Sequence, residues 1–464
     1  MSDLLLTHGY FLYEDLKELQ ILKPYVPLGL LYICAHLRAK GFDVDVFDTT
    51  FSTTEELKKH LESEHPSVLG IYANLMTRKK VVEILQIARR SGWKTVVGGP
   101  EPGAYVREYL EAGADVVVIG EGESAMEELL PVLRSRSDSA LQNISGIAFM
   151  GNSGRLHHTP PRPQIPDLDA LPWPARDAID LKRYVDTWRG AHGKGSLSFI
   201  TARGCPYHCR WCSHQVFGKT HRRRKPAKVV EEVEWLLHTY QPDMVWIADD
   251  VFTIHHGWLR SYAAEMRQRG LRIPFECITR ADRLNSESAD LLAELGCFRL
   301  WIGSESGSQK ILDAMQRGVT VEQVHSAVDL CKTRGIQTGM LLMWGYEGEE
   351  LEDIEATIDH VKRTDPDVFF TTVAYPIKGT PYYENAANHL VQLQPWSQSS
   401  DRELLLRDRQ SPEFYACADR LLQNEVQLAR LQRAGQDEVT QQGLQQQVKT
   451  LRASLYARSS EVKA

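Results

Sequence analysis

Short apolar runs alternate with amphipathic segments along the first 150 residues. The runs rich in β-branched and aliphatic residues predict strands at residues 4–7, 44–47, 68–72, 95–97 and 116–119. Between them, residues 27–40, 79–91 and 123–134 place apolar side chains at three- and four-residue intervals, as amphipathic helices do. This alternation predicts a doubly wound α/β unit with a parallel sheet, whose ligand would lie beyond the carboxyl ends of the strands.

A second series of apolar runs begins near residue 196. It predicts strands at residues 197–201, 244–248, 275–279, 299–302, 339–343 and 369–374, with helical patterns such as 227–240 and 286–295 between them. Six such units predict a partial (β/α)6 barrel of the TIM type. Functional groups are expected where its strands end and loops begin.

Two further segments differ from these units. Residues 146–194 contain His157 through Pro163 and Leu171 through Pro174, which are too proline-rich for regular elements and predict an extended linker. The tail is Gln-rich, charged and helical by pattern, with one apolar stripe at Leu444, Val448, Leu451 and Leu455. A helical cap or a self-association surface fits that stripe. The predicted organisation is therefore 1–145, 146–194, 195–400 and 401–464.

Composition narrows the classes of partner. Of 464 residues, 42% are hydrophobic and 25% are charged, and the formal net charge is −7, so neither a nucleic-acid partner nor an anionic membrane surface is expected. No uninterrupted apolar stretch reaches membrane-spanning length, and no secretion signal is recognised. The eight cysteines then indicate reduced thiols rather than a disulfide framework, and a cytoplasmic location.

The most specific motif places Cys205, Cys209 and Cys212 in one short loop after the first barrel strand. Three soft thiolates in this spacing select either zinc or an iron–sulfur cluster. A structural zinc site completed by His208 or His214 is the alternative. Because a long α/β unit needs no zinc staple, the incomplete thiolate set favours a 4Fe–4S cluster with one iron left open.

This CxxxCxxC loop, with Tyr207 and Trp211 inside it, resembles the radical S-adenosylmethionine superfamily. The resemblance implies that the open iron chelates the amino and carboxylate groups of S-adenosylmethionine. An electron from the reduced cluster then cleaves the cofactor's C–S bond and gives a 5′-deoxyadenosyl radical. The resemblance therefore also implies a low-potential electron donor, such as a flavodoxin or a ferredoxin.

The ends of later barrel strands support the resemblance. Asp249 and Asp250 stand in a DD-x-FT sequence, Arg280 ends the third strand, and Ser304 and Glu305 belong to a GxES segment. In related families these positions approach the methionine and nucleoside ends of S-adenosylmethionine, so the five residues are candidate cofactor ligands. Residues 345–349 resemble a GxPGE turn less closely. Each acid could instead cap a helix or supply a charge in its first turn.

Two other sets of residues are expected to be structural. The basic run from Arg222 to Lys225 is interpreted as a solvated face, in preference to a phosphate or substrate clamp. Four cysteines lie within apolar patterns and are expected to be small buried hydrophobes: Cys34, Cys277, Cys297 and Cys331.

The N-terminal unit lacks a GxGxxG sequence, which disfavours a nicotinamide site. Residues 24–41, 96–100 and 114–123 instead resemble the cobalamin-binding domains that are fused to radical enzymes. The resemblance implies a Rossmann-like fold and a cobalamin cradle at Gly98, Gly99, Pro100, Glu121 and Gly122. The DxHxxG sequence that supplies an axial histidine is absent, so no ligand from that motif is expected. A degenerate domain without cofactor is the alternative.

Together these resemblances imply radical chemistry on an unactivated carbon of a small-molecule substrate. The outcome would be methyl transfer, or an oxidative cyclisation as in enzymes of the anaerobic magnesium-protoporphyrin ester cyclase type. A methylthiotransferase is disfavoured, because only Cys34 lies in the N-terminal unit and a second cysteine triad is missing. A non-catalytic cobalamin- or metal-binding regulator is the alternative from another class. The sequence assigns no catalytic side chain and names no substrate.

Overall fold

The computed structural model describes residues 2–135, 138–435 and 438–459. Its N-terminal sheet contains β1 (Leu4–His8), β2 (Val44–Phe47), β3 (Val68–Tyr72), β4 (Lys94–Gly98) and β5 (Val116–Val118). These five strands are parallel in the order β2-β1-β3-β4-β5, and β6 (Ile147–Met150) and β7 (Leu156–His158) extend the β5 edge antiparallel. The order is that of flavodoxin-like sheets, in which ligands bind at the carboxyl ends of the strands.

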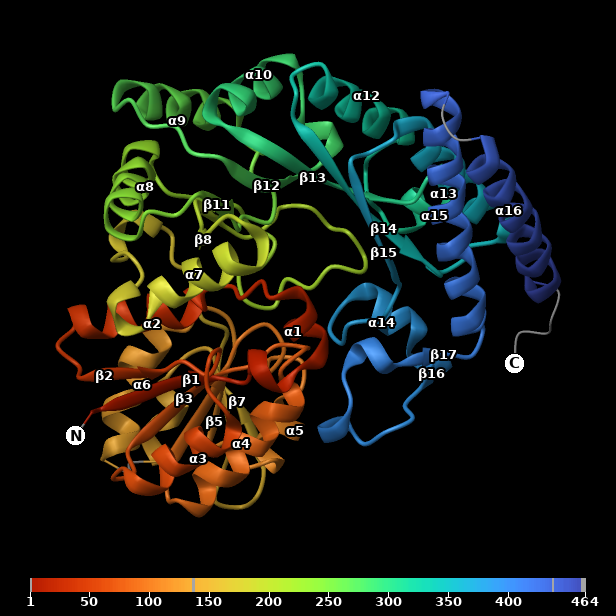
Figure 1. Ribbon diagram of the computed structural model, residues 1–464. Coiled ribbons are helices and arrows are strands. Elements are labelled where there is room, and N and C mark those ends of the chain that lie inside the picture. The colour runs from red at the N-terminus through yellow and green to blue at the C-terminus, as the bar shows by residue number, and fades with distance from the viewer. Residues whose placement is uncertain (1, 136–137, 436–437, 460–464) are drawn as a thin grey trace.

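Helices cover both faces of this sheet (Figure 1). α2 (Leu28–Ala39) and α6 (Glu123–Arg134) bury their apolar residues with Leu4 and Leu6 of β1, whereas α3 (Thr54–Ser63), α4 (Arg78–Arg90) and α5 (Val106–Glu111) pack on the face of Leu5. Successive strand residues point to opposite faces, and both faces are covered, which is why the strands are continuously apolar. The predicted doubly wound unit is confirmed. A short helix, α1 (Leu16–Ile21), follows β1.

The second sheet is a six-stranded partial barrel. Its strands are β8 (Ser196–Phe199), β11 (Met244–Ile247), β12 (Phe275–Thr279), β13 (Cys297–Glu305), β14 (Gln337–Trp344) and β15 (Val368–Val373), all parallel and in sequence order. The connecting helices are α8 (Pro226–Tyr240), α9 (His256–Gln268), α10 (Ser286–Leu295), α11 (Gln309–Ala314), α12 (Val321–Lys332) and α13 (Leu351–Thr364). This arrangement confirms the predicted (β/α)6 barrel.

The predicted irregular linker is wrong for three stretches. β6 lies at its start, β7 includes His157 and His158, and α7 (Leu181–His192) lies beyond the last proline of the segment. α7 begins at the cap residue Asp180, ends at Gly193 in a left-handed conformation, and buries Tyr184 and Trp188. The prolines lie outside all three stretches, so they do not prevent these elements from forming. The boundaries at 145 and 194 remain predictions.

The C-terminal region packs against the barrel. α14 (Pro381–Ala386) and a small hairpin of β16 (Leu390–Val391) and β17 (Leu405–Leu406) precede α15 (Pro412–Ala434) and α16 (Glu438–Ser459). Leu444, Val448 and Leu455 are buried in the barrel's main core, so the helical-cap interpretation is confirmed. The two long helices lie side by side at the outer edge of the barrel (Figure 1). In the described part of the chain, no helix is long and apolar enough to cross a membrane.

Candidate cofactor cavity between the two sheets

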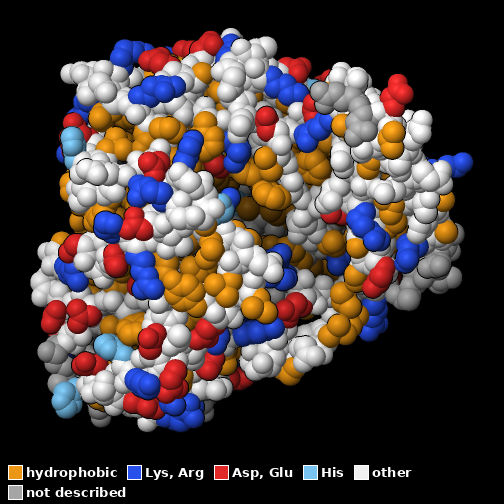
Figure 2. Space-filling view, viewed as in Figure 1, with side chains coloured by type: hydrophobic (Ala, Val, Ile, Leu, Met, Phe, Trp, Pro, Cys, Tyr) orange, Lys and Arg blue, Asp and Glu red, His pale blue; other side chains and the backbone are white. Residues whose placement is uncertain are grey.

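One continuous cavity of about 1080 Å³ lies between the N-terminal sheet and the barrel. Its N-terminal wall includes Gly98 through Pro100 and Glu121 through Glu123, and its barrel wall includes the three cysteines of the loop. The molecule is visibly hollowed between its two halves (Figure 2). Pockets for a single drug-sized ligand occupy about 300–1,000 Å³. The cavity is therefore slightly larger than a typical single-ligand pocket, and it meets the carboxyl ends of strands from both sheets.

Two glycines at the end of β4 shape the N-terminal wall. A Cβ added at Gly98 would meet only Val118, at an ordinary 3.6 Å, so glycine here leaves the wall flat without being required by the fold. Gly99 is different: its φ is +121°, and a Cβ would stand 2.3 Å from the carbonyl oxygen of Ala73. Only glycine tolerates that conformation and contact. This stretch of the wall presents backbone to the cavity, which fits a large flat ring such as a corrin.

Glu121 ties the two halves together across the cavity rim. Its carboxylate accepts hydrogen bonds from Arg203 at 2.8 Å, from Arg222 at 2.7 Å and from the backbone N–H of Ile165 at 2.8 Å. Glu123 pairs with the same Arg203 at 2.6 Å. The Glu121 oxygens already accept hydrogen bonds from three donors. Although Glu121 lines the cavity, its main role is therefore to anchor the barrel to the N-terminal unit.

The predicted solvated basic face is wrong for three of its four residues. Arg222 pairs with Glu121, Arg223 with Asp249 and Arg224 with Glu232, and the three side chains are 11%, 5% and 5% exposed. Such charges are buried in proteins only when they are paired. Arg222 and Arg223 form β10 (Arg222–Arg223), which pairs with β9 (Ala202–Arg203), and Arg224 follows it directly. The charges of the run therefore form ion pairs within the fold. Lys225 is exposed, as expected.

The cysteine loop spans the gap between β9 and β10, and all three of its cysteines line the cavity. Cys209 is buried and Cys205 and Cys212 are half-buried. Burial raises the pKa of the Cys205 thiol above its usual range and that of Cys212 to about 12. A bound iron reverses this preference, because a metal deprotonates a coordinating thiol outright.

The donor set fits an iron–sulfur cluster better than a zinc ion. Among the described residues, no group of three His, Cys, Asp or Glu side chains converges closely enough to hold one metal ion. Zinc binds sulfur at about 2.3 Å in a closed tetrahedron, whereas a cluster takes each thiolate on a different iron. His208 is exposed, and His214 lines the cavity with its Nε2 unpartnered. The geometry therefore does not support the zinc alternative.

Two guanidinium groups stand beside the loop. Arg280 donates from Nη1 to Cys209 Sγ at 3.8 Å, and Arg317 donates from Nη1 to the same sulfur at 3.6 Å. The Arg280 guanidinium also lies 3.6 Å from the centre of the Tyr207 ring. Both arginines line the cavity, as does Trp211, whereas Tyr207 does not. Tyr207 is thus placed to position Arg280.

The adjacent acids Asp249 and Asp250 have different surroundings. Asp249 accepts hydrogen bonds from the backbone N–H groups of Thr201 at 2.6 Å and Ala202 at 3.1 Å, is buried, and does not line the cavity. Asp250 faces the cavity, and burial together with the neighbouring Asp249 charge raises its pKa to about 6. Of these two predicted cofactor ligands, only Asp250 faces the cavity.

Ser304 and Glu305 at the end of β13 also differ in whether they face the cavity. Ser304 is buried away from the cavity and bonds through Oγ to His360 Nε2 at 2.9 Å. Glu305 lines the cavity in a left-handed conformation, with φ +62°, which is uncommon for a residue other than glycine. Burial raises its pKa, and Arg317 at 3.6 Å opposes that rise. The turn at residues 345–349 lies outside the cavity wall.

Sequence reasoning missed Arg203, Arg317 and the role of His8. His8 ends β1 and lines the cavity, but its Nε2 bonds to Asp48 at 3.0 Å and its Nδ1 accepts from the N–H of Tyr10 at 3.2 Å. Neither nitrogen is left free for a cobalt ion.

Four cysteines outside the loop were expected to be small buried hydrophobes. This expectation is confirmed, because all four are at most 5% exposed: Cys34, Cys277, Cys297 and Cys331.

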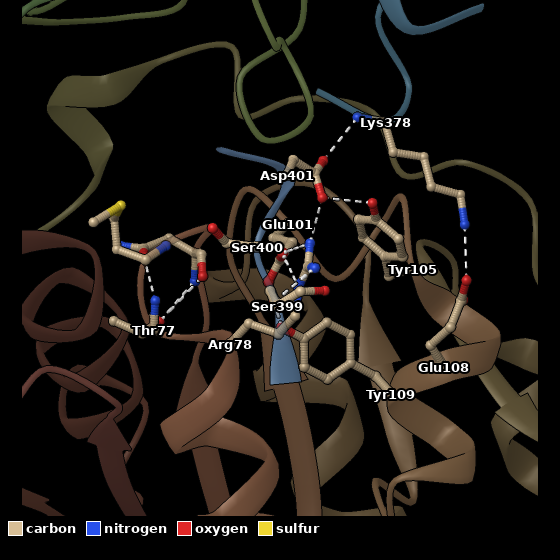
Figure 3. Close-up of polar contacts among 12 residues, drawn as sticks. Thr77, Arg78, Glu101, Tyr105, Glu108, Tyr109, Lys378, Ser399, Ser400 and Asp401 are labelled. Carbon is tan, nitrogen blue, oxygen red and sulfur yellow. Dashed lines mark hydrogen bonds and ion pairs between the residues drawn. The ribbon is translucent and has the colours of Figure 1, made fainter. Parts of the chain in front are cut away.

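A buried ion-pair network, here named the clasp, joins α4 and the loop after β4 to residues 378–401 (Figure 3). Arg78 begins α4 and donates to Glu101 and to Asp401, each at 2.6 Å, and Asp401 also accepts from Tyr105 at 2.6 Å. The N–H of Lys378 donates to Asp401 at 3.0 Å. The clasp therefore fastens the segment before α15 to the N-terminal unit.

Comparison with known proteins agrees with this geometry. Residues 199–361 match the Radical SAM superfamily, and residues 20–130 match the B12 binding domain. An uncharacterised methyltransferase of Pyrococcus horikoshii is 30% identical over 380 residues, which cover 80% of each chain. The anaerobic magnesium-protoporphyrin IX monomethyl ester cyclase of Rubrivivax gelatinosus is 28% identical over 352 residues, 74% of this chain and 63% of that one.

A solved structure shows the same fold. The radical S-adenosylmethionine methyltransferase TsrM from Kitasatospora setae, with cobalamin and a [4Fe–4S] cluster bound, superposes with a TM-score of 0.68 over 84% of this chain and 75% of its own, at 22% identity. The chain belongs to the radical S-adenosylmethionine enzymes that carry a cobalamin-binding domain. Its cofactors are a 4Fe–4S cluster, S-adenosylmethionine and cobalamin.

Proposed function

We propose that this enzyme transfers a methyl group to an unactivated carbon of a small-molecule substrate, with both organic cofactors held in one cavity. The observation that carries the proposal is the continuity of that cavity. The glycine wall at Gly98 and Gly99 and the cysteine loop border the same space of about 1080 Å³.

The walls suggest a division of roles. We assign Cys205, Cys209 and Cys212 to the cluster, and Gly98, Gly99, Pro100 and Gly122 to the corrin. Trp211, Asp250, Arg280 and Glu305 surround the remaining space on the barrel side, where S-adenosylmethionine would bind. Tyr207, Asp249, Ser304 and Glu121 act through their neighbours as positioning residues. When bound, the cluster and S-adenosylmethionine supply a carbon radical, and cobalamin supplies a methyl group.

The charges on the barrel wall suit a zwitterionic ligand. Arg280 and Arg317 offer guanidinium N–H groups to a carboxylate, and Asp250 and Glu305 offer oxygens to an ammonium group or to hydroxyls. Because these side chains are in place within a largely apolar enclosure, their interactions are stronger than they would be in bulk water. The same enclosure keeps water away from a reactive carbon radical.

Oxidative cyclisation is the second candidate. Magnesium-protoporphyrin IX monomethyl ester cyclases of three organisms are 26% to 28% identical to this chain over 352 to 382 residues. The relative from Pyrococcus horikoshii, at 30% identity, has a methyltransferase name, as does TsrM. We favour methyl transfer because the relative with the highest identity among these is named for it.

We also propose a low-potential flavodoxin or ferredoxin as the electron donor and the cytoplasm as the location. Both follow from the cluster, which must be reduced towards the negative end of the range that iron–sulfur clusters span, roughly −700 to +450 mV. All eight cysteines are free thiols, which is consistent with a reducing compartment.

The proposed activity can be tested without knowing the substrate. The anaerobically reconstituted protein is incubated with hydroxocobalamin, S-adenosylmethionine and a low-potential reductant. A methyltransferase is expected to accumulate methylcobalamin and S-adenosylhomocysteine in equal amounts, and to form 5′-deoxyadenosine separately. Formation of 5′-deoxyadenosine with no methylcobalamin would refute methyl transfer and favour cyclisation. The Cys205/Cys209/Cys212→Ala variant serves as control and is expected to form no 5′-deoxyadenosine.

A further inference from the structure

The three cysteines of the loop differ in the charges around them. Only Cys209 has a guanidinium N–H within hydrogen-bonding distance of its sulfur, and it has two, from Arg280 at 3.8 Å and Arg317 at 3.6 Å. Cys205 instead accepts a hydrogen bond from the backbone N–H of Tyr207, and Cys212 donates to the carbonyl of Ser213 at 3.9 Å. Cys209 is also the buried member of the three. Its sulfur therefore lies where a positive charge acts most strongly.

Both arginines are held firmly in this position. Arg317 donates from Nη2 to the carbonyl of Gly303 at 3.0 Å, and its Nε lies 3.6 Å from Glu305. Arg280 donates from Nη2 to the carbonyl of Arg317 at 2.8 Å and from Nε to Asp282 at 2.9 Å. Arg280 is thus oriented by two hydrogen bonds and Arg317 by one hydrogen bond and a nearby carboxylate, and each directs Nη1 at the sulfur. This fixed fork is a property that lysine cannot reproduce.

We propose that Arg280 and Arg317 set the reduction potential of the cluster through N–H···S hydrogen bonds to Cys209. Hydrogen bonds to cluster sulfurs and the net charge around them are established determinants of the potential. Reduction adds negative charge to the cluster and its thiolates, so two cationic donors stabilise the reduced form more than the oxidised form. The pair raises the potential and brings one-electron reduction within reach of the donor.

This inference rests on the cluster and not on the reaction that follows. It requires neither cobalamin nor substrate, and it concerns the cluster before S-adenosylmethionine binds. The same two arginines also line the cavity, where they could bind the carboxylate of S-adenosylmethionine. A test without S-adenosylmethionine separates that binding role from an effect on the reduction potential.

The test is a potentiometric titration of the reconstituted cluster, followed by electron paramagnetic resonance, with no S-adenosylmethionine present. Iron and sulfide are measured first in wild type, Arg317→Met, Arg280→Lys and Arg283→Lys. Arg283 is the matched control, because it pairs with the same Asp282 and lies near the same Tyr207 ring but has no recorded contact with Cys209. Arg317→Met is expected to lower the one-electron equilibrium constant at least tenfold, or about 59 mV. Arg280→Lys is expected to shift it in the same direction by less, and Arg283→Lys not at all.

A second variant separates the thiolate contact from the loss of an ion pair. In Arg317→Met the Glu305 carboxyl loses its partner, and its charge alone could lower the potential. The double variant Arg317→Met/Glu305→Gln removes that charge and is expected to keep the lowered potential.

Three results would overturn the proposal. The first is an unchanged potential in Arg317→Met and Arg280→Lys when only the affinity for S-adenosylmethionine falls. The second is full recovery of the potential in the double variant. The third is a folded variant, judged by circular dichroism, that holds no cluster with either substitution, because the arginines would then serve assembly. Absence of iron and sulfide from wild type would instead refute the cluster itself.

Discussion

The two walls of the cavity are built on different principles. At the end of β4 the N-terminal wall presents backbone: Gly98 leaves it flat, Gly99 is required by its own conformation, and the charges of Glu121 and Glu123 nearby are neutralised by an arginine of the barrel. The barrel wall is charged, with Asp250, Arg280, Glu305 and Arg317 all facing the cavity.

The difference teaches which ligand each wall can recognise. A flat backbone surface recognises a large ring by shape and contact area, whereas an array of fixed charges recognises a small zwitterion or a cluster by electrostatics. Ligand binding at the N-terminal wall should therefore be sensitive to added side-chain volume. Ligand binding at the barrel wall should be sensitive to the removal of a charge or of a cysteine sulfur. The following variants separate these sensitivities.

The largest effect is expected from the cysteine loop. The Cys205/Cys209/Cys212→Ala variant should lose essentially all of the roughly four irons and four sulfides that wild type binds. It should keep its corrinoid, because the glycine wall is untouched. Metal, sulfide and corrinoid analysis after anaerobic reconstitution measures both. Joint loss of corrinoid and iron would show that the walls do not act separately.

The reciprocal change adds volume to the glycine wall. Gly98→Leu projects a side chain past Val118 into the cavity, where the backbone tolerates a Cβ. Corrinoid affinity should fall at least about tenfold, or about 1.4 kcal/mol, while cluster content and thermal unfolding stay as in wild type. Equilibrium dialysis against hydroxocobalamin measures the affinity. Unchanged affinity would place the corrin elsewhere.

The clasp tests whether the halves are held together by buried charge. Arg78→Met leaves Glu101 and Asp401 buried without their cation, and the expected loss is about 3–5 kcal/mol in the free energy of unfolding. Chemical denaturation measures it. Lys79→Met is the matched control, because Lys79 and its partner Glu403 are both half exposed, and the loss there should stay below about 1 kcal/mol. Equal losses would contradict the role given to the clasp.

The last effect depends on pH and concerns the support of the charged wall. His360 bonds to Ser304 and to His325, and burial lowers its pKa to about 3, from about 6.5 in the unfolded chain. Below pH 6.5 the unfolded state binds the proton preferentially, so stability is lost as the pH falls from 6.5 towards 3. At pH 5 the loss is about 2 kcal/mol. His360→Gln should flatten this slope in denaturation curves between pH 7 and 5. An equal slope in wild type and variant would assign the proton to another group.

The sequence predicts features that depend on residues close together along the chain, and it misses contacts between residues far apart in the sequence. The cysteine spacing is local, and the apolar runs of the strands are read directly from neighbouring residues, so the parallel strands of both sheets and the position of the loop were predicted correctly, whereas the antiparallel β6 and β7 were not. Arg317 follows a short helix with no motif, and its contact with Cys209 joins positions 108 residues apart. The clasp joins Arg78 and Asp401 across 323 residues. No local pattern reports such contacts.

For the basic run, a local sequence pattern led to a wrong prediction. Arg222, Arg223 and Arg224 form a cluster of like charge in one dimension, which predicts a solvated face. In three dimensions each meets an acid from a different element, at positions 121, 249 and 232. Asp249 was likewise recognised by its motif, but only the fold shows that its oxygens are occupied by backbone donors of the neighbouring strand end.

The central claim is that one cavity holds the cluster and the corrin together. The most direct measurement is the spin relaxation of cob(II)alamin in protein whose cluster has been reduced to its paramagnetic state. The account predicts faster relaxation of the cobalt signal in wild type than in the Cys205/Cys209/Cys212→Ala variant loaded with the same corrinoid. Identical relaxation in the two proteins would place the centres apart and contradict the shared cavity.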